Sequence, residues 1–481
     1  MNRRMVLYTI GQLIGVEAVI LLLPLAVSVI YGEECYKTFL INIAVAAALS
    51  LLAIVFARPK NHVIYAKEGF ATVALAWIFM SAIGALPFVI SGEIPRFVDA
   101  WFETVSGFTT TGSSVVENVE VLSRGILFWR SLTHWLGGMG ILVFIMAILP
   151  SAADRSIHIM RAEVPGPIVG KLVPKIRDTA KILYLIYMGL TVLETILLVL
   201  GGMPLFDSVV HSMGTAGTGG FGIKEDSIAG YSNYCQWVIT VFMLMFGINF
   251  NLFYLMLIRR FKLVAKNGEL WTYLGIVAAG VIMITVNIYP MYQSFSESIR
   301  LSAFQVASVI TTTGYATADF NTWPLFSKGL LLTFMFCGAC AGSTGGGLKV
   351  SRVIIIVKSI KRELHRLIHP RSRTTVRLDG KPVDEATVNG AGCYLALYVV
   401  CLMVVFLLLC LDSGFDIESN FGAAVSCFNN IGPGFGLVGP TSNFAAYSDF
   451  SKVVLSFAML LGRLELFPVI ITLAPSTWTK K

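Results

Sequence analysis

The sequence predicts an all-α polytopic membrane protein with ten transmembrane helices, in which an N-terminal helix pair precedes four similar repeats around one central pore. Three observations support this fold class: the composition, the number of long apolar stretches, and a glycine-containing tract that occurs four times. Of the 481 residues, 56% are apolar and 13% are charged, whereas soluble globular chains have roughly a quarter charged residues. Soluble, disordered and coiled-coil classes are therefore excluded. We also expect no nucleic-acid partner, because basic residues in a membrane protein set its orientation and account for the net charge of +8.

A transmembrane helix needs about 20 mostly apolar residues. The stretch that follows Arg3 and Arg4 resembles a signal peptide, but its length of 26 residues exceeds the roughly 7–15 of such a segment, so we expect it to be a retained first span. Stretches of suitable length and polarity lie near residues 6–31, 40–57, 69–90, 126–149, 182–203, 236–258, 271–290, 329–357, 391–411 and 453–474.

The distribution of lysine and arginine predicts the orientation of these spans. With the N-terminus inside, the inner segments contain 27 of the 36 basic residues. This asymmetry agrees with the positive-inside rule without moving any helix. Both termini are therefore predicted to be cytoplasmic.

Four of the outer connections contain a short apolar segment that cannot cross a bilayer and suits a re-entrant helix. These segments are residues 99–109, 207–217, 301–311 and 419–429. Thirteen residues before the tract glycines stand Asp99, Asp207 and Ser419, which we expect to cap the short helices. The repeat divides the chain into a helix pair at 1–62 and repeats at 63–150, 151–262, 263–360 and 361–481, with a basic cytoplasmic loop at 358–389.

Each short segment leads into a small polar tract with a glycine, and the four glycines are spaced by 108, 94 and 118 residues. Irregular backbone at membrane depth is tolerated only where it lines a cavity or is buried in protein. A single tract of this kind is equally well interpreted as a glycine-rich turn, but four of them around one axis form rings of oxygen atoms that can replace the water shell of a cation. The predicted filter residues are Thr110, Thr111, Gly112, Thr218, Gly219, Gly220, Thr312, Thr313, Gly314, Asn430, Ile431 and Gly432.

The third tract, Thr312-Thr313-Gly314-Tyr315, resembles the Thr-Val-Gly-Tyr signature of potassium channels. The fourfold repeat resembles the superfamily of potassium transporters that includes TrkH, KtrB and the plant HKT proteins, and the two extra N-terminal spans and the tract 109–112 are most similar to the TrkH branch. The resemblance implies potassium uptake across a bacterial inner membrane, and a homodimer with one pore in each protomer. Four residues depart from the signature, which implies moderate selectivity: Gly219, Asn430, Ile431 and Pro433.

The second helix of each repeat is interrupted near its middle, at residues 136–140, 247–249, 337–347 and 462–468. The third interruption holds five glycines, each of which costs about 1 kcal/mol in a helix relative to alanine. Close packing of small residues is one interpretation; a flexible flap below the filter is the one we prefer, and the resemblance implies that this loop is the gate. The predicted gate residues are Gly342, Ser343, Thr344, Gly345, Gly346, Gly347, Lys349 and Arg463.

Arg463 lies within the last span, where a charge is expensive and indicates function. The alternative is that it pairs with Glu465 or with backbone carbonyls. The resemblance implies that this arginine lies in the pore below the filter. Glu17, Glu194, Arg130 and His134 also lie in or near spans, and we expect them to pair between helices.

The partners predicted for the chain are potassium ions as substrate and membrane lipid, and no cofactor is expected on the chain itself. The resemblance adds a cytosolic nucleotide-binding ring of the TrkA type, which the basic stretch 358–381 could bind. The nearest alternative function is a sodium- or proton-coupled symporter that uses the same filter. An intramembrane enzyme is not expected, because no suitable set of catalytic residues is found at mid-membrane, and a non-conducting subunit would not need four tracts.

Overall fold

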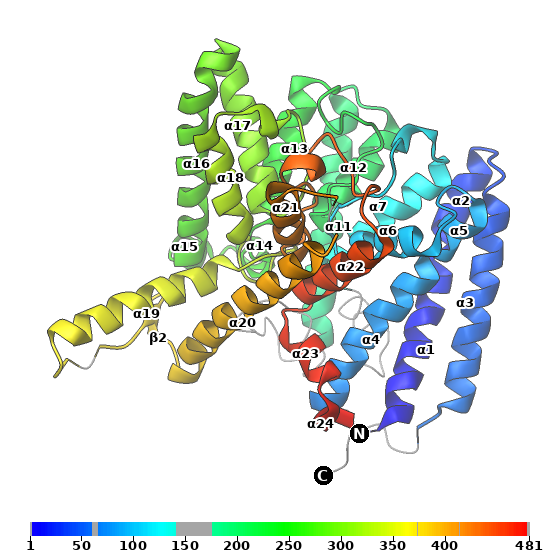
Figure 1. Cartoon of the computed structure of the whole chain (residues 1–481), viewed down its shortest axis with the longest axis horizontal. Helices are drawn as coiled ribbons and strands as arrows, with labels where there is room; N and C mark the ends of the chain where they lie inside the picture. Colours follow the sequence, from blue (N-terminus) through cyan, green and yellow to red (C-terminus); the bar gives the residue numbers. More distant parts are fainter. Residues whose placement is uncertain (1, 60–65, 141–175, 373, 413, 479–481) are drawn as a thin grey trace.

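The structure is a computed structural model of the whole chain and describes residues 2–59, 66–140, 176–372, 374–412 and 414–478. It is almost entirely helical (Figure 1). Residues 141–149 of the predicted span 126–149 and most of the predicted inner segment 155–181 lie outside the described residues.

The N-terminal helices pack on the first part of the remaining chain, where α1 contacts both α3 and α4. Their outer faces are apolar and exposed, as Leu51 and Val55 show with exposed fractions of 65% and 61%. This is the surface expected of helices that face lipid. The bounds of the N-terminal helices are α1 Arg3–Ile20, α2 Leu22–Ile30 and α3 Tyr36–Phe56.

The rest of the chain forms four successive groups of helices, each with a long first helix, a short helix and a second helix. The first group has α4 Ala66–Gly84, α5 Leu86–Ser91, α6 Phe97–Phe108, η1 Val119–Val121 and α7 Arg124–Gly138. The second has α11 Ile176–Leu200, α12 Leu205–Gly217, α13 Asn233–Phe246, α14 Phe250–Leu257 and α15 Phe261–Ala265.

The third group has α16 Gly268–Tyr292, α17 Phe295–Ile310, η2 Phe320–Thr322, α18 Leu325–Phe336 and α19 Val350–Ile368. An antiparallel hairpin of β1 Arg377–Leu378 and β2 Lys381–Pro382 follows it. The fourth group has α20 Glu385–Leu409, α21 Ile417–Phe428, η3 Gly436–Val438, α22 Asp449–Arg463, α23 Phe467–Leu473 and α24 Pro475–Trp478.

Six helices of the described residues are long and apolar enough to cross a membrane, and a seventh span results if the bent pair α13 and α14 is counted as one. The other predicted spans are those in which the sequence indicates a break. The two helices of the bent pair meet at 94°, α19 follows α18 after thirteen residues without helix, and α22 ends at Arg463 before α23 begins at Phe467. Ten spans therefore remain a prediction.

The four groups pack in a closed order. The second helix of each group contacts the short helix of the next one, through the pairs α7 with α12, α13 with α17, α18 with α21, and α22 with α6. The last pair joins the end of the chain to its first group. This closure places the ends of the four short helices around a common centre.

Candidate functional site

The backbone takes the same unusual turn at the end of all four short helices. Non-glycine residues with positive φ are uncommon, and β-branched residues in this region are outliers. Here the same two positions are left-handed in every tract: Thr110, Thr218, Thr312 and Asn430 with φ of 55–57°, and Gly112, Gly220, Gly314 and Gly432 with φ of 73–102°. For the three threonines and the asparagine this conformation costs about 1–3 kcal/mol per residue, so it persists only where the surrounding structure enforces it.

The same hydrogen bond supports each turn. The N–H of the residue before the glycine donates to the carbonyl of a small residue in the last turn of the short helix, which uses up a carbonyl that the helix end leaves free. The four bonds are Thr111 to Ser106 at 2.9 Å, Gly219 to Gly214 at 2.9 Å, Thr313 to Ser308 at 2.8 Å, and Ile431 to Ser426 at 3.0 Å. Each acceptor is a small residue that lies six positions before the tract glycine.

Most carbonyl oxygens of the tracts remain free of such bonds. Those of residues 110–112, 218–220, 312–314 and 430–431 accept no hydrogen bond from the part of the chain that the structure describes. That of the predicted filter residue Gly432 differs, because it accepts from the hydroxyls of Ser113 at 3.1 Å and Ser426 at 2.6 Å. Buried carbonyls are nearly always paired with protein, water or a ligand. A group of unpaired carbonyls at one place is therefore chemically suited to a cation.

The four tracts close into a ring. An ideal β-carbon on Gly112 would lie 2.0 Å from the carbonyl oxygen of Gly219, and the same relation leads from each tract to the next: Gly220 to Thr313 at 2.0 Å, Gly314 to Ile431 at 2.0 Å, and Gly432 back to Thr111 at 2.8 Å. Each glycine thus lets the neighbouring tract approach to backbone contact. The sequence of contacts follows chain order and returns to its start.

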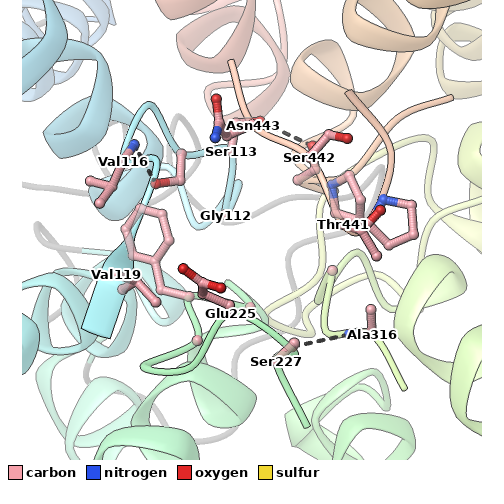
Figure 2. Close-up of a pocket in the computed structure, with 18 of the residues that line it drawn as sticks. Gly112, Ser113, Val116, Val119, Glu225, Ser227, Ala316, Thr441, Ser442 and Asn443 are labelled. Carbon is pink, nitrogen blue, oxygen red and sulfur yellow. Dashed lines mark hydrogen bonds between the residues drawn. The ribbon is translucent and has the colours of Figure 1, made fainter. Parts of the chain in front are cut away.

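A cavity of about 240 Å³ lies on one side of this ring, and all four tract glycines line it. Figure 2 shows how segments from all four groups surround it, with Gly112, Ser227, Ala316 and Thr441 on different sides. The N–H of Ala316 donates to the Ser227 hydroxyl at 3.2 Å and joins the second and third segments at the rim. Both acidic and basic side chains line the cavity, including Glu117, Glu225, Arg130 and Lys224.

A buried ion pair lies behind the first tract. Arg130 was singled out from the sequence, but its partner Glu103 was not. Arg130 pairs with Glu103 at 2.7 Å, with both side chains at most 3% exposed. Glu103 also accepts from the N–H of Val115 at 3.0 Å, and the Arg130 guanidinium lies 4.1 Å from the ring centre of Phe221. The pair therefore fixes the chain that leaves the first tract against the chain that leaves the second. The expected pairing of Arg130 between helices is confirmed, because Glu103 lies on α6 and Arg130 on α7.

The helix breaks place glycines directly under the tracts. An ideal β-carbon on Gly137 would lie 1.9 Å from the carbonyl oxygen of Phe108, and one on Gly462 would lie 2.1 Å from that of Phe428. Both carbonyls are at the ends of short helices. A side chain at either glycine would push the second helix away from the tract.

The glycine loop between α18 and α19 lies against the third and fourth tracts. The N–H of Gly346 donates to the Thr312 hydroxyl at 2.6 Å, and a β-carbon on Gly346 would lie 2.6 Å from the carbonyl oxygen of Asn429. The ammonium of Lys349 donates to the carbonyls of Gly345 and Gly346. Hydrogen bonds within the loop and to Thr312 therefore hold it in a defined conformation.

Arg463 connects this loop to the break in the first group. Its guanidinium donates to the carbonyl of Thr344 at 2.8 Å and to those of Gly137 and Gly138 at 2.5 and 2.7 Å. The alternative partner Glu465 instead forms an ion pair with Arg352. The bonds to carbonyls agree with the alternative interpretation of Arg463, which was pairing with Glu465 or with backbone carbonyls.

Other expected contacts differ from the structure. The N-caps of α6 and α12 are Arg96 and Pro204, whereas Asp99 pairs with Lys452 at 2.6 Å and Asp207 accepts from Tyr231 at 2.8 Å. The N-cap of α21 is Asp416, which accepts from the N–H of Ser419 at 2.9 Å. The three predicted caps were therefore wrong by about one turn.

The remaining polar residues within spans have different surroundings. The carboxylate oxygens of Glu17 are buried and have no hydrogen-bond partner among the described residues, so its expected pairing is not seen there. The same holds for Glu194, whose carboxylate oxygens are buried without a hydrogen-bond partner among the described residues. His134 contacts α6 and the second tract, as its bonds to Gly107 and Phe221 show.

The comparisons with known proteins agree over the whole chain. Residues 34–274 and 270–480 match the sequence model of the TrkH family, described as a cation transport protein. The chain is 35% identical to the Trk system potassium uptake protein TrkH of Escherichia coli strain K12, over 99% of this chain and 100% of that protein. TrkG of the same strain is 34% identical, over 99% and 98%. The crystal structure of the potassium transporter TrkH from Vibrio parahaemolyticus superposes with a TM-score of 0.89 and 32% identity over 100% of both chains.

Proposed function

This chain belongs to the TrkH family of cation transport proteins, and we propose that it takes up potassium through a channel-like pore with a four-part selectivity filter. Its relatives are potassium uptake proteins and not enzymes. Potassium is accordingly the substrate, and the filter residues are those of the four tracts from Thr110 to Gly432.

The observation that carries this proposal is the ring of tracts with unpaired carbonyls. Each tract presents consecutive carbonyl oxygens without a hydrogen-bond partner in the described chain, and four backbones meet at contact distance. Rings of carbonyl oxygens can replace the hydration shell of potassium. The short helices add to this effect, since the partial negative charge of a helix C-terminus favours a cation.

We propose that the loop 342–347, together with Lys349 and Arg463, is the gate of this pore. The loop lies against the third and fourth tracts and is bonded to Thr312. Two cationic side chains hold its carbonyls. Positive charge at this place opposes the passage of a cation, so movement of the loop and of these side chains would open the path.

We further propose ten spans arranged in the four repeats, with both termini on the cytoplasmic side of a bacterial inner membrane. The helix α24 and the first turn of α1 lie at the same end of the molecule (Figure 1), which supports a common side for the termini. A homodimer with one pore per protomer, and a cytosolic nucleotide-binding ring of the TrkA type, are the partners that we propose by family resemblance.

Rubidium uptake into liposomes that contain only this protein tests the proposal, with membrane potential, sodium gradient and proton gradient set independently. Flux that follows the potential alone is expected of a channel-like pore. An absolute requirement for a sodium or proton gradient would instead establish the coupled symporter. Loss of selectivity for rubidium over sodium after substitution of the tract glycines is the accompanying result expected of a filter.

A further inference from the structure

The two ends of the glycine loop meet at a single carboxylate oxygen. Glu269 lies in the first turn of α16 and is 6% exposed. Its Oε1 accepts hydrogen bonds from the N–H of Ala341 at 2.7 Å and of Ser351 at 3.1 Å. We propose that Glu269 is a positioning residue that holds the ends of this loop together and thereby keeps the loop against the tracts, an inference that rests on the proposed gate.

The contacts around Glu269 form the neck of the loop. Below the glycines, Cys337 and Leu348 form an isolated parallel bridge, in which the N–H of Gly338 donates to the Leu348 carbonyl at 2.8 Å. The N–H of Val350 donates to the Ala339 carbonyl at 3.2 Å. Glu269 lies just beyond these bonds. Backbone hydrogen bonds thus pair the two segments of the neck, and the side chain of Glu269, which comes from outside the loop, connects their far ends.

The neck determines where the tip of the loop can lie. The tip contacts the tracts through the bond of Gly346 to Thr312 at 2.6 Å, and the carbonyl of Gly342 accepts from the N–H of Phe250 at 3.0 Å. Glycine-rich segments have many accessible conformations. A fixed distance between the ends removes most of them, and the carboxylate supplies that restraint from a helix outside the loop.

Reach, and not charge, is the property that this role requires. Both N–H groups bond to the same oxygen, and the carbonyl oxygen of a glutamine can accept both in the same place. An aspartate keeps the charge but withdraws the oxygen by one methylene group. E269Q and E269D therefore separate a positioned acceptor from a negative charge that attracts cations.

The native thiol of Cys340 reports directly on the loop. It precedes Ala341, is 0% exposed, and its N–H donates to the Gly247 carbonyl at 3.0 Å. The experiment measures the rate of N-ethylmaleimide labelling in full-length protein with Cys340 as the only cysteine, reconstituted in liposomes. Rubidium flux and melting temperature are measured on the same preparations.

We expect E269A and E269D to accelerate labelling about tenfold, the factor that corresponds to loss of the hydrogen bonds that Oε1 accepts. We expect E269Q to remain within about twofold of the parent, because its amide oxygen accepts both bonds in the same place. E385A is the matched control: Glu385 lies in the first turn of α20, is exposed, and contacts Arg362. It should label at the parent rate.

Unchanged labelling in E269A, or fast labelling in E269Q with slow labelling in E269D, would overturn the role of Glu269. If E269A fails to fold, the comparison of E269D with E269Q decides the question by itself. Fast labelling without any rise in rubidium flux would uphold the role of Glu269 in the loop and contradict the proposed gate. The two inferences therefore fail in different measurements.

Discussion

The imidazole of His134 occupies the space that a side chain at Gly219 would fill: an ideal β-carbon on Gly219 would lie 2.2 Å from the His134 Cγ atom. The ring Nδ1 lies 2.8 Å from the Gly107 carbonyl, and Nε2 accepts from the N–H of Phe221 at 3.3 Å. These partners are satisfied by one neutral tautomer, with the proton on Nδ1. The departure of the second tract from the Thr-Gly pattern thus has a structural cause, because a histidine from the first group supports this tract.

This relation predicts coupling between the two residues. G219A should lower the melting temperature, because the new methyl group collides with a ring that is fixed at both nitrogens. H134A should also lower it through loss of two hydrogen bonds, each worth about 1 kcal/mol. In the double variant the methyl group occupies the space left by the ring. The decrease in melting temperature should therefore be smaller than the sum of the two single decreases. Additive losses would show that the ring and Gly219 do not share this space.

The ring of tracts predicts a graded effect of alanine at the four glycines. At Gly112, Gly220 and Gly314 a β-carbon would lie 2.0 Å from a carbonyl oxygen of the next tract, but at Gly432 the distance is 2.8 Å. All four have positive φ, so the conformational penalty of alanine is similar at each. The overlap of the new methyl group with the neighbouring carbonyl is smaller at Gly432. We expect G432A to keep most of the preference for rubidium over sodium and the other three to lose it. Competition assays in liposomes measure this preference. Selectivity equal to that of the parent in all four variants would contradict a filter at this ring, and equal loss in all four would contradict the grading alone.

The short helices and the breaks could be predicted because their signals are local. Their length and the glycines that follow are visible in sequence, and α12 ends at Gly217, as predicted. The contacts of charged residues could not be predicted in this way. Lys452, which pairs with Asp99, is 353 positions away in the chain. Nothing near Glu269 in the sequence indicates a loop more than seventy residues later.

The pairing of Arg463 with Glu465 was considered because the two residues are close in sequence. Residues two positions apart do not face each other on a helix, and Glu465 and Leu466 both have positive φ at the break. This turn directs Glu465 toward Arg352 on α19. The close backbone approach between neighbouring tracts at their glycines could not be predicted either, because the four tracts are far apart in the sequence.

The buried pair of Glu103 and Arg130 predicts a large loss of stability when one partner is removed. Replacement of one member of a buried ion pair costs about 3–5 kcal/mol, because the other charge stays buried without a partner. E103Q should therefore lower the melting temperature strongly and weaken selectivity, since Glu103 also holds Val115 beside the first tract. D449N is the control, because Asp449 and Arg96 form an exposed pair and such pairs are worth about 0–1 kcal/mol. Similar melting temperatures for the two variants would contradict this role.

The contacts of Arg463 predict the order of flux among three proteins. R463A removes the donor that joins the Thr344 carbonyl in the loop to the carbonyls of Gly137 and Gly138, and it removes a positive charge near the proposed ion path. Rubidium flux should rise several-fold. R463K keeps the charge but lacks the planar fork that reaches carbonyls on two segments at once, so its flux should lie between that of the parent and R463A. R4A, at an exposed arginine of α1, is the control for loss of a positive charge and should conduct like the parent. Flux and melting temperature on the same preparations separate this role from a purely structural one. An alanine variant that is less stable and no more conductive would assign Arg463 to packing. A lysine variant equal to the parent in flux and in melting temperature would show that charge alone forms the barrier.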